Sequence, residues 1–242
     1  MKTETQTKEY KFEGNPVVPV PRIGNLVYDE RGQEILAIHN ERFRGISHIE
    51  DKTKYKEGQP LLYSNVPRAL SYAQLLRERF QDMHVLSPEE VVQYWSSIPE
   101  RDSTDADTNS VSVYPNKGCN EDLRQRVLAI LGKQETEIPL AVSGLGVERA
   151  DNNYGFTFTE KEATRAEESP YFQRDGKVRY DGTRLVQSEE GVPIWVPESQ
   201  SGLRELFRVR SDRLLARLGI LLYSDESGRV QVLYDPQGRA EK

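Results

Sequence analysis

The sequence contains a single cysteine, Cys119, and only three histidines among its 242 residues. One cysteine cannot form an intramolecular disulfide, and the count excludes zinc sites built from several cysteines. The histidines, His39, His48 and His84, lack the spacing of a metal-binding pair on one helix. We therefore expect a fold that is held together by its packed core, in a reducing compartment.

Long apolar runs are also missing. No stretch of about 18 apolar residues could cross a bilayer, and the first residues, MKTETQTKEYKFEG, lack the apolar core of a signal peptide. The formal net charge is −6, so the molecule as a whole repels a phosphate backbone, and nucleic acid could bind only through a local patch. These absences predict a cytoplasmic protein without a membrane partner.

What is present is a series of short apolar segments that alternate with helical patterns. Strands are expected at 83–86, 111–115 and 138–142, and helices at 64–80, 87–98 and 120–132. Ser87 and Asn120 stand at the N-caps of the last two helices, and Gly132 stands where the third one ends. Strands that are separated by helices at this spacing are typical of a parallel sheet. The sequence thus predicts an α/β fold with a short parallel βαβαβ sheet flanked by helices.

The remaining segments divide the chain into three parts. Residues 1–24 are expected to form an extended, proline-containing lead-in, residues 25–155 the α/β domain, and residues 156–242 a mixed α+β region, either separate or part of the same domain. Hairpins are predicted at 26–38 and 220–235. The spacing of Leu203, Phe207, Leu214 and Leu218 predicts a helix over 201–219.

The segment PLAVSGLGVERADNNYG, residues 139–155, provides the first candidate site. Gly144 and Gly146 would let backbone N–H groups approach a phosphate, and Ser143 would add a hydroxyl group. In a parallel sheet these residues, with Asn120 at the start of the preceding helix, would lie at the carboxyl ends of the strands, where ligands bind. The dinucleotide-binding, Walker-type and nucleophile-elbow motifs are all incomplete here. A structural bend without a ligand is therefore the alternative.

The acidic segment RDSTDADTNS, residues 101–110, provides a second candidate site, for a metal ion. Asp105, Asp107 and Asn109 match the first three ligand positions of a calcium-binding loop, but Ser110 replaces the glycine that the loop requires. Asp105 and Asp107 could still hold a magnesium ion beside a phosphate. The alternative is an ordinary solvated loop.

Basic residues provide a third candidate site. Arg210, Arg213 and Arg217 lie along one flank of the helix expected at 201–219. They could contact RNA, or their stems could cover the edges of an apolar stripe and pair with acidic neighbours. The net negative charge favours the second interpretation.

These features leave three functional hypotheses. The first is a protein that binds a nucleotide or phosphosugar at the carboxyl ends of the strands. Such a protein could also catalyse a transferase or hydrolase reaction on this ligand. The second is a non-catalytic module with a protein partner, and the third is an RNA-contacting protein. The sequence identifies neither a cofactor nor a substrate, and it does not decide whether the protein is an enzyme.

Overall fold

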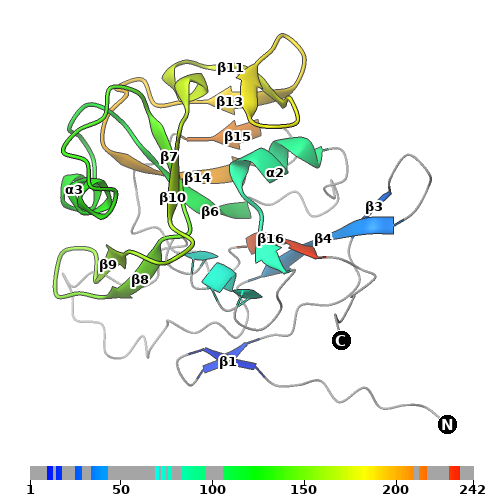
Figure 1. The fold of residues 1–242 in the computed structure, drawn as a ribbon, viewed down its shortest axis with the longest axis horizontal. Helices are drawn as coiled ribbons and strands as arrows, with labels where there is room; N and C mark the ends of the chain where they lie inside the picture. Colours follow the sequence, from blue (N-terminus) through cyan, green and yellow to red (C-terminus); the bar gives the residue numbers. More distant parts are fainter. Residues whose placement is uncertain are drawn as a thin grey trace.

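The computed structural model describes residues 10–12, 15–17, 25–28, 34–42, 69–70, 72–74, 76–77, 83–95, 106–209, 213–216 and 229–234. The strands in chain order are β1 (Tyr10–Phe12), β2 (Asn15–Val17), β3 (Asn25–Tyr28), β4 (Glu34–Arg42), β5 (His84–Val85), β6 (Ala106–Val113), β7 (Leu140–Ser143), β8 (Gly146–Arg149), β9 (Phe156–Thr159), β10 (Arg165–Glu168), β11 (Gly176–Tyr180), β12 (Leu185–Gln187), β13 (Val192–Trp195), β14 (Leu203–Val209), β15 (Arg213–Leu215) and β16 (Arg229–Tyr234). Helices α2 (Pro88–Gln93) and α3 (Glu121–Ile130) and the 3₁₀ helix η3 (Pro170–Gln173) pack around them (Figure 1).

Within the described residues, twelve strands form one mixed sheet. Its order is β12-β11-β13-β15-β14-β6-β16-β4-β3, with β7 and β10 joined to β6, and β5 joined to β16. Strand β6 is the branch point, because it pairs with β14 along its length, with β7 through residues 110–113, and with β16 through Asp107. The sheet therefore has two arms that meet at β6.

The predicted α/β fold is wrong, because the protein is mostly β. Strands β6 and β7 flank α3 as expected, but they are antiparallel, with Ser110 opposite Ser143. Strand β5 pairs with β16 rather than with β6. Among the described strands, only β13 with β15 and β16 with β6 are parallel pairs. A long connection through a helix can join either parallel or antiparallel strands. The alternation of strands and helices in the sequence therefore does not determine the relative direction of the strands.

Several local predictions are confirmed. The hairpin at 26–38 corresponds to β3 and β4, which pair antiparallel. Helix α2 begins after Ser87, whose side chain accepts a hydrogen bond from Glu90 N in a complete capping box. Helix α3 ends before Gly132, which has a φ of +66°. The described residues between 69 and 77 are helical, as expected for the segment 64–80.

Asn120 is not a side-chain cap, contrary to the prediction. It adopts a left-handed backbone conformation with a φ of 58° and makes no capping hydrogen bond with its side chain. Its Nδ2 atom instead donates to the carbonyl oxygen of Leu203, 2.8 Å away. Asn120 therefore ties the start of α3 to β14.

Two further predictions are wrong in the same direction, since segments expected to be helix or loop are strands. The predicted helix at 201–219 is replaced by β14 and β15 in its described part. The second half of the acidic segment, from Ala106 to Ser110, belongs to β6 and is buried. For the hairpin at 220–235, β16 is a strand that pairs with β4, and residues 217–228 lie outside the described part.

Two apolar clusters form the core on either side of the branch point. One lies between α2, η3 and the inner face of β11, β13 and β15, and the other lies between α3 and strands β6, β7 and β9. Strands from both predicted parts, 25–155 and 156–242, share the large sheet, and the division into domains stays a prediction. No helix in the described part of the chain is long and apolar enough to span a bilayer.

Candidate functional site

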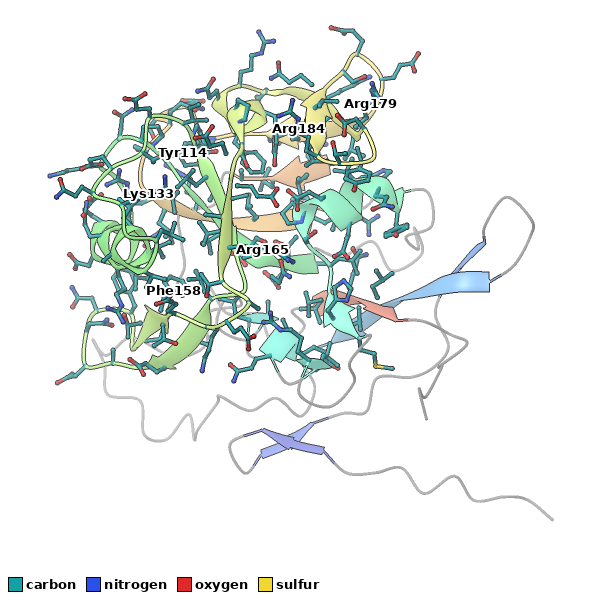
Figure 2. All side chains as sticks on the ribbon, viewed as in Figure 1. Tyr114, Lys133, Phe158, Arg165, Arg179 and Arg184 are labelled. Carbon is teal, nitrogen blue, oxygen red and sulfur yellow. The ribbon has the colours of Figure 1, made fainter. Side chains whose placement is uncertain are left out.

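A cavity of about 190 Å³ opens between α2, β6, β7, β10 and the hairpin of β11 and β12. Most of its lining is polar: Ser87, Glu89, Glu90, Ser110, Ala141, Ser143, Arg165, Glu167, Tyr180 and Thr183. Figure 2 labels Arg165 near the centre of the view, where β10 passes in front of the sheet beside α2. Ionisable groups of both signs and three serine residues thus line one small space.

The register of three neighbouring strands explains how the strand residues reach the cavity together. Ser110 of β6 lies opposite Ser143 of β7, which in turn lies opposite Arg165 of β10. Residues directly opposite in antiparallel strands project to the same face of the sheet. Arg165 Nε donates a hydrogen bond to Ser143 Oγ, 3.3 Å away. Glu167 follows two residues later on the same face, because side chains alternate along a strand.

Helix α2 contributes two adjacent carboxyl groups, and the first of these to consider is Glu90. Its Oε1 atom lies 2.6 Å from His84 Nε2, and its Oε2 atom accepts a hydrogen bond from Ser87 N at 2.9 Å. Burial alone would raise the pKa of Glu90, but the hydrogen bond and charge of His84 and the hydrogen bonds of Ser87 together lower this pKa below its ordinary value. Glu90 is therefore held as a carboxylate.

Glu89 has the opposite electrostatic character. Burial raises the pKa of its carboxyl group, and the nearby Glu167 carboxylate raises this pKa further. The hydroxyl of the buried Tyr171 donates to Glu89 Oε1, 3.3 Å away. Adjacent carboxyl groups whose pKa values are pushed apart can divide the roles of proton donor and proton acceptor.

A larger groove of about 740 Å³ adjoins this cavity and shares Glu167 with it. The groove is bounded by the end of β10, η3 and β12, and its wall includes the guanidinium groups of Arg174 and Arg184. Arg174 Nη2 donates to Gln187 Oε1 at 2.8 Å, while Arg184 is exposed. A ligand that extends out of the small cavity would pass between carboxylates and arginines.

Of the residues that the sequence suggested for ligand binding, Ser143 lines this cavity. Gly144 and Gly146 follow Ser143 but are absent from the cavity lining. Gly144 has a φ of +72°, and a Cβ atom there would collide with the carbonyl group of Ala163. A Cβ atom at Gly146 would meet the side chains of Thr159 and Lys161. The packing thus accounts for both glycines, and their role as a phosphate cradle stays a prediction.

Of the other candidate residues, the three that the structure describes, Asn120, Asp107 and Arg213, are absent from the cavity lining. Asp107 is buried in β6, and Asp105 falls outside the described residues. The described part of the chain contains no group of three or more His, Cys, Asp or Glu side chains that could hold a metal ion. Arg213 stacks on Trp195, whereas Arg210 and Arg217 are outside the described part.

The sequence interpretation missed all four charged residues of the cavity lining: Glu89, Glu90, Arg165 and Glu167. Glu89 and Glu90 follow Ser87 in the first turn of the expected helix at 87–98, where acidic residues are common without any role in binding. Arg165 and Glu167 belong to β10, RAEE, which carries no apolar alternation. The available signal was the spacing of Arg165 and Glu167, which stand two residues apart and therefore lie on the same face if the segment is a strand.

Comparisons with known proteins add no precedent for this cavity. No protein-family model matches the chain, and neither does any curated protein or solved structure.

Proposed function

We propose that this protein binds a small polyhydroxylated ligand that carries phosphate, such as a phosphosugar or a nucleotide, in the cavity between α2 and β10. The observation that carries the proposal is the meeting of Glu89, Glu167, Arg165 and Ser143 around one opening. These side chains come from three separate elements. Glu89 is half-buried and Glu167 is exposed beside it, and two neighbouring carboxyl groups resist ionising together unless a cation or a ligand compensates for the repulsion.

The lining suggests which part of the ligand goes where. Carboxylates and serine hydroxyls form hydrogen bonds with sugar hydroxyl groups, and an arginine provides the fork of donors that suits phosphate. Arg165 is exposed at the cavity, and Arg184 lies beyond it in the adjoining groove. The hydroxyl-bearing ring is therefore expected inside, near Glu89, with the phosphate directed toward the arginines.

The size of the space limits the ligand. Binding sites for drug-sized molecules occupy about 300–1,000 Å³, and the cavity alone, at about 190 Å³, is smaller. It suits one ring, whereas a nucleotide would need the adjoining groove of about 740 Å³ as well. This difference in volume supports a phosphosugar as the better fit for the cavity by itself.

The experiment is isothermal titration calorimetry with ribose 5-phosphate, glucose 6-phosphate, AMP, ribose and inorganic phosphate. We expect a sugar phosphate to bind more tightly than ribose or phosphate alone, because only it satisfies both groups of side chains. Arg165→Gln should weaken this binding by about tenfold or more, as expected for the loss of a charge-assisted hydrogen bond.

The matched control is Lys133→Gln, which removes an exposed positive charge from the turn after α3. It should leave the titration unchanged, whereas a general effect of net charge would weaken both variants equally. The absence of heat from every ligand at millimolar concentration would refute the proposal.

A further inference from the structure

A second groove, of about 360 Å³, lies at the C-terminal end of α2. Its lining is mostly apolar and includes two aromatic rings: Val92, Gln93, Trp95, Val178, Arg179, Tyr180, Gly191 and Val192. We call this space the α2 groove. Its volume falls within the range of about 300–1,000 Å³ that is typical of small-molecule sites.

The register of β11 and β13 explains why the floor of the α2 groove is apolar. Val178 of β11 lies opposite Val192 of β13, and both side chains are buried in the core beside α2 (Figure 1). Tyr180 follows Val178 by two residues and therefore projects to the same face. Gly191 has a φ of +141°, and a Cβ atom there would collide with the carbonyl group of Val178. The glycine thus lets the chain pass close to β11 at this end of the groove.

Trp95 forms the wall of the α2 groove on the helix side. It follows the C-terminus of α2 and is half-buried against the core. The guanidinium carbon of the buried Arg208 lies 4.8 Å from the centre of its ring, and this cation–π contact holds the indole from the core side. A ring that is fixed in place can contact another planar group at little cost in conformational entropy.

Two exposed polar side chains complete the lining. Gln93 of α2 carries a carboxamide, which both donates and accepts hydrogen bonds. Arg179 of β11 carries a planar guanidinium group, which can stack on another flat group. The edge of a nucleobase presents donors and acceptors side by side, whereas an alkyl chain presents neither. The lining therefore suits a nucleobase better than an aliphatic chain.

The α2 groove adjoins the cavity between α2 and β10, because Tyr180 lines both spaces. Glu89 of the cavity and Val92 of the α2 groove are three residues apart on one helix, which corresponds to about 4.5 Å along its axis. The groove that contains Arg174 and Arg184 shares Glu167 with the cavity and no residue with the α2 groove. The cavity thus connects an aromatic groove with an arginine-lined one, in the order of the base, sugar and phosphate of a nucleotide.

We propose that the α2 groove binds the base of a nucleotide whose sugar occupies the cavity between α2 and β10. The inference rests on the proposed function, which places the sugar and the phosphate, and it narrows the ligand class from sugar phosphates to nucleoside phosphates. The base contacts Trp95 and Tyr180, and the carboxamide of Gln93 binds its edge. The cavity by itself holds one ring, and the α2 groove provides the space for the second.

The experiment is isothermal titration calorimetry with AMP, ribose 5-phosphate, adenosine and octyl glucoside. We expect AMP to bind at least tenfold more tightly than ribose 5-phosphate, as is typical of one base stacked on an aromatic side chain. Adenosine should bind more tightly than octyl glucoside, because the alkyl chain leaves Gln93 without a hydrogen-bonding partner in the ligand.

Fluorescence shows whether the base reaches the α2 groove. The chain contains two tryptophans, so Trp195→Phe leaves Trp95 as the only one. AMP should quench the emission of Trp95 in this variant, because the base lies against the indole. Ribose 5-phosphate should leave the emission unchanged.

Variants test the two kinds of contact in the otherwise wild-type chain. Gln93→Ala should weaken the binding of AMP about fivefold, and Trp95→Leu should weaken it tenfold or more. Both should bind ribose 5-phosphate like the wild type, which shows that the cavity is intact. Gln125→Ala is the matched control, since Gln125 is also exposed on a helix but belongs to α3. It should bind AMP with unchanged affinity.

The results distinguish the failure of this inference from that of the proposed function. Equal affinity for AMP and ribose 5-phosphate would overturn the inference and leave the proposed function standing. Octyl glucoside that binds as tightly as adenosine would also overturn it, because the groove would then accept any apolar group. Binding of adenosine with quenching of Trp95, but no binding of ribose 5-phosphate, would support the base site and contradict the sugar phosphate site. The absence of binding by all four compounds would overturn both.

Discussion

Helices α2 and α3 both carry two acidic residues in their first turn, but the charged side chains that they bury have different surroundings. In α3 the fully buried Arg124 donates through Nε to Tyr114 O at 2.8 Å and through Nη2 to Pro115 O and to Glu135, each at 2.6 Å. Its Nη1 atom donates to Glu121, 3.1 Å away. In α2, Glu89 faces a cavity and has the like charge of Glu167 nearby.

The comparison distinguishes a charged side chain that stabilises the fold, Arg124, from one that is free to interact with a ligand, Glu89. A buried ion whose hydrogen-bonding groups all meet protein partners is a structural element, and its removal leaves those partners unsatisfied. A half-buried carboxyl group next to a like charge costs stability and is expected where a ligand compensates for it. Substitutions of Arg124 in α3 and of Glu89 in α2 should therefore shift stability in opposite directions.

The largest expected effect is that of Arg124→Met in α3. Removing one partner from a buried charged network costs about 3–5 kcal/mol, so we expect a loss of this size in the free energy of unfolding measured in urea. Arg126→Met is the matched control on the same helix, because its Nε atom makes one hydrogen bond, to Phe158 O. It should cost about 1 kcal/mol. Equal losses would show that the Arg124 network has no special role.

The next effect concerns the bend after β7, beside the cavity. Gly144→Ala should destabilise the protein by roughly 2–4 kcal/mol, because the residue combines a positive φ with a collision against Ala163. Gly182 also has a positive φ, +101°, but has no neighbour near its Cβ position. Gly182→Ala should thus cost about 1 kcal/mol. Thermal denaturation of both variants measures the part due to packing.

A smaller effect is expected for Glu90→Gln, which weakens the bonds to His84 and Ser87. The folded-state pKa of Glu90 is below its ordinary value of 4.5, so its contribution is present above pH 4.5 and is lost as the pH falls through the folded-state pKa. We expect the variant to lose about 1 kcal/mol at pH 7. The difference from the wild type should shrink toward pH 3 in urea titrations, and a constant difference would exclude an ionic contribution.

The smallest effect has the opposite sign. The folded-state pKa of Glu89 is raised, so the stability that it contributes is present below pH 4.5 and is lost as the pH rises through the folded-state pKa. Glu89→Gln should therefore be more stable than the wild type at pH 7, by about 0.5–1 kcal/mol. The same variant should bind a sugar phosphate more weakly. Glu148→Gln, on the exposed side of β8, should change neither quantity.

The elements that could be predicted from the sequence are those that bury one face and expose the other. Helix α3 and the capped start of α2 were found because their apolar positions recur at helical spacing and Ser87 stands before Pro88. Strand β14 was missed because both of its faces are buried: Leu203 belongs to the core beside α3, and Leu206 to the core beside α2. Such a strand loses the alternation that would distinguish it from a helix.

Polar residues in the middle of the sheet caused the other errors. Thr108 and Ser110 suggested a loop, yet both are buried in β6, where Thr108 Oγ1 donates to Leu206 O and Ser110 Oγ donates to Asn109 Oδ1. Internal hydrogen bonds, rather than apolar contacts, make their burial tolerable. The candidate cavity was missed for a related reason, because its residues come from distant strands and only the pairing register brings them together.

The position of β16 in the large sheet bears on how the chain reaches its fold. Val230 and Val232 lie opposite residues of β4, β5 and β6, which precede them in the chain by more than 100 residues. Pairing strands that are so far apart in the sequence closes a long loop, and the chain loses the conformational entropy of that loop before the new contacts stabilise it. This loss is why folds with many such contacts take milliseconds or longer to form. A nascent chain that has not yet been synthesised through Tyr234 lacks the strand that joins β4 to β6. Until then β4 and β6 lack their β16 partner, and unpaired strand edges of this kind are where strands of other chains can add.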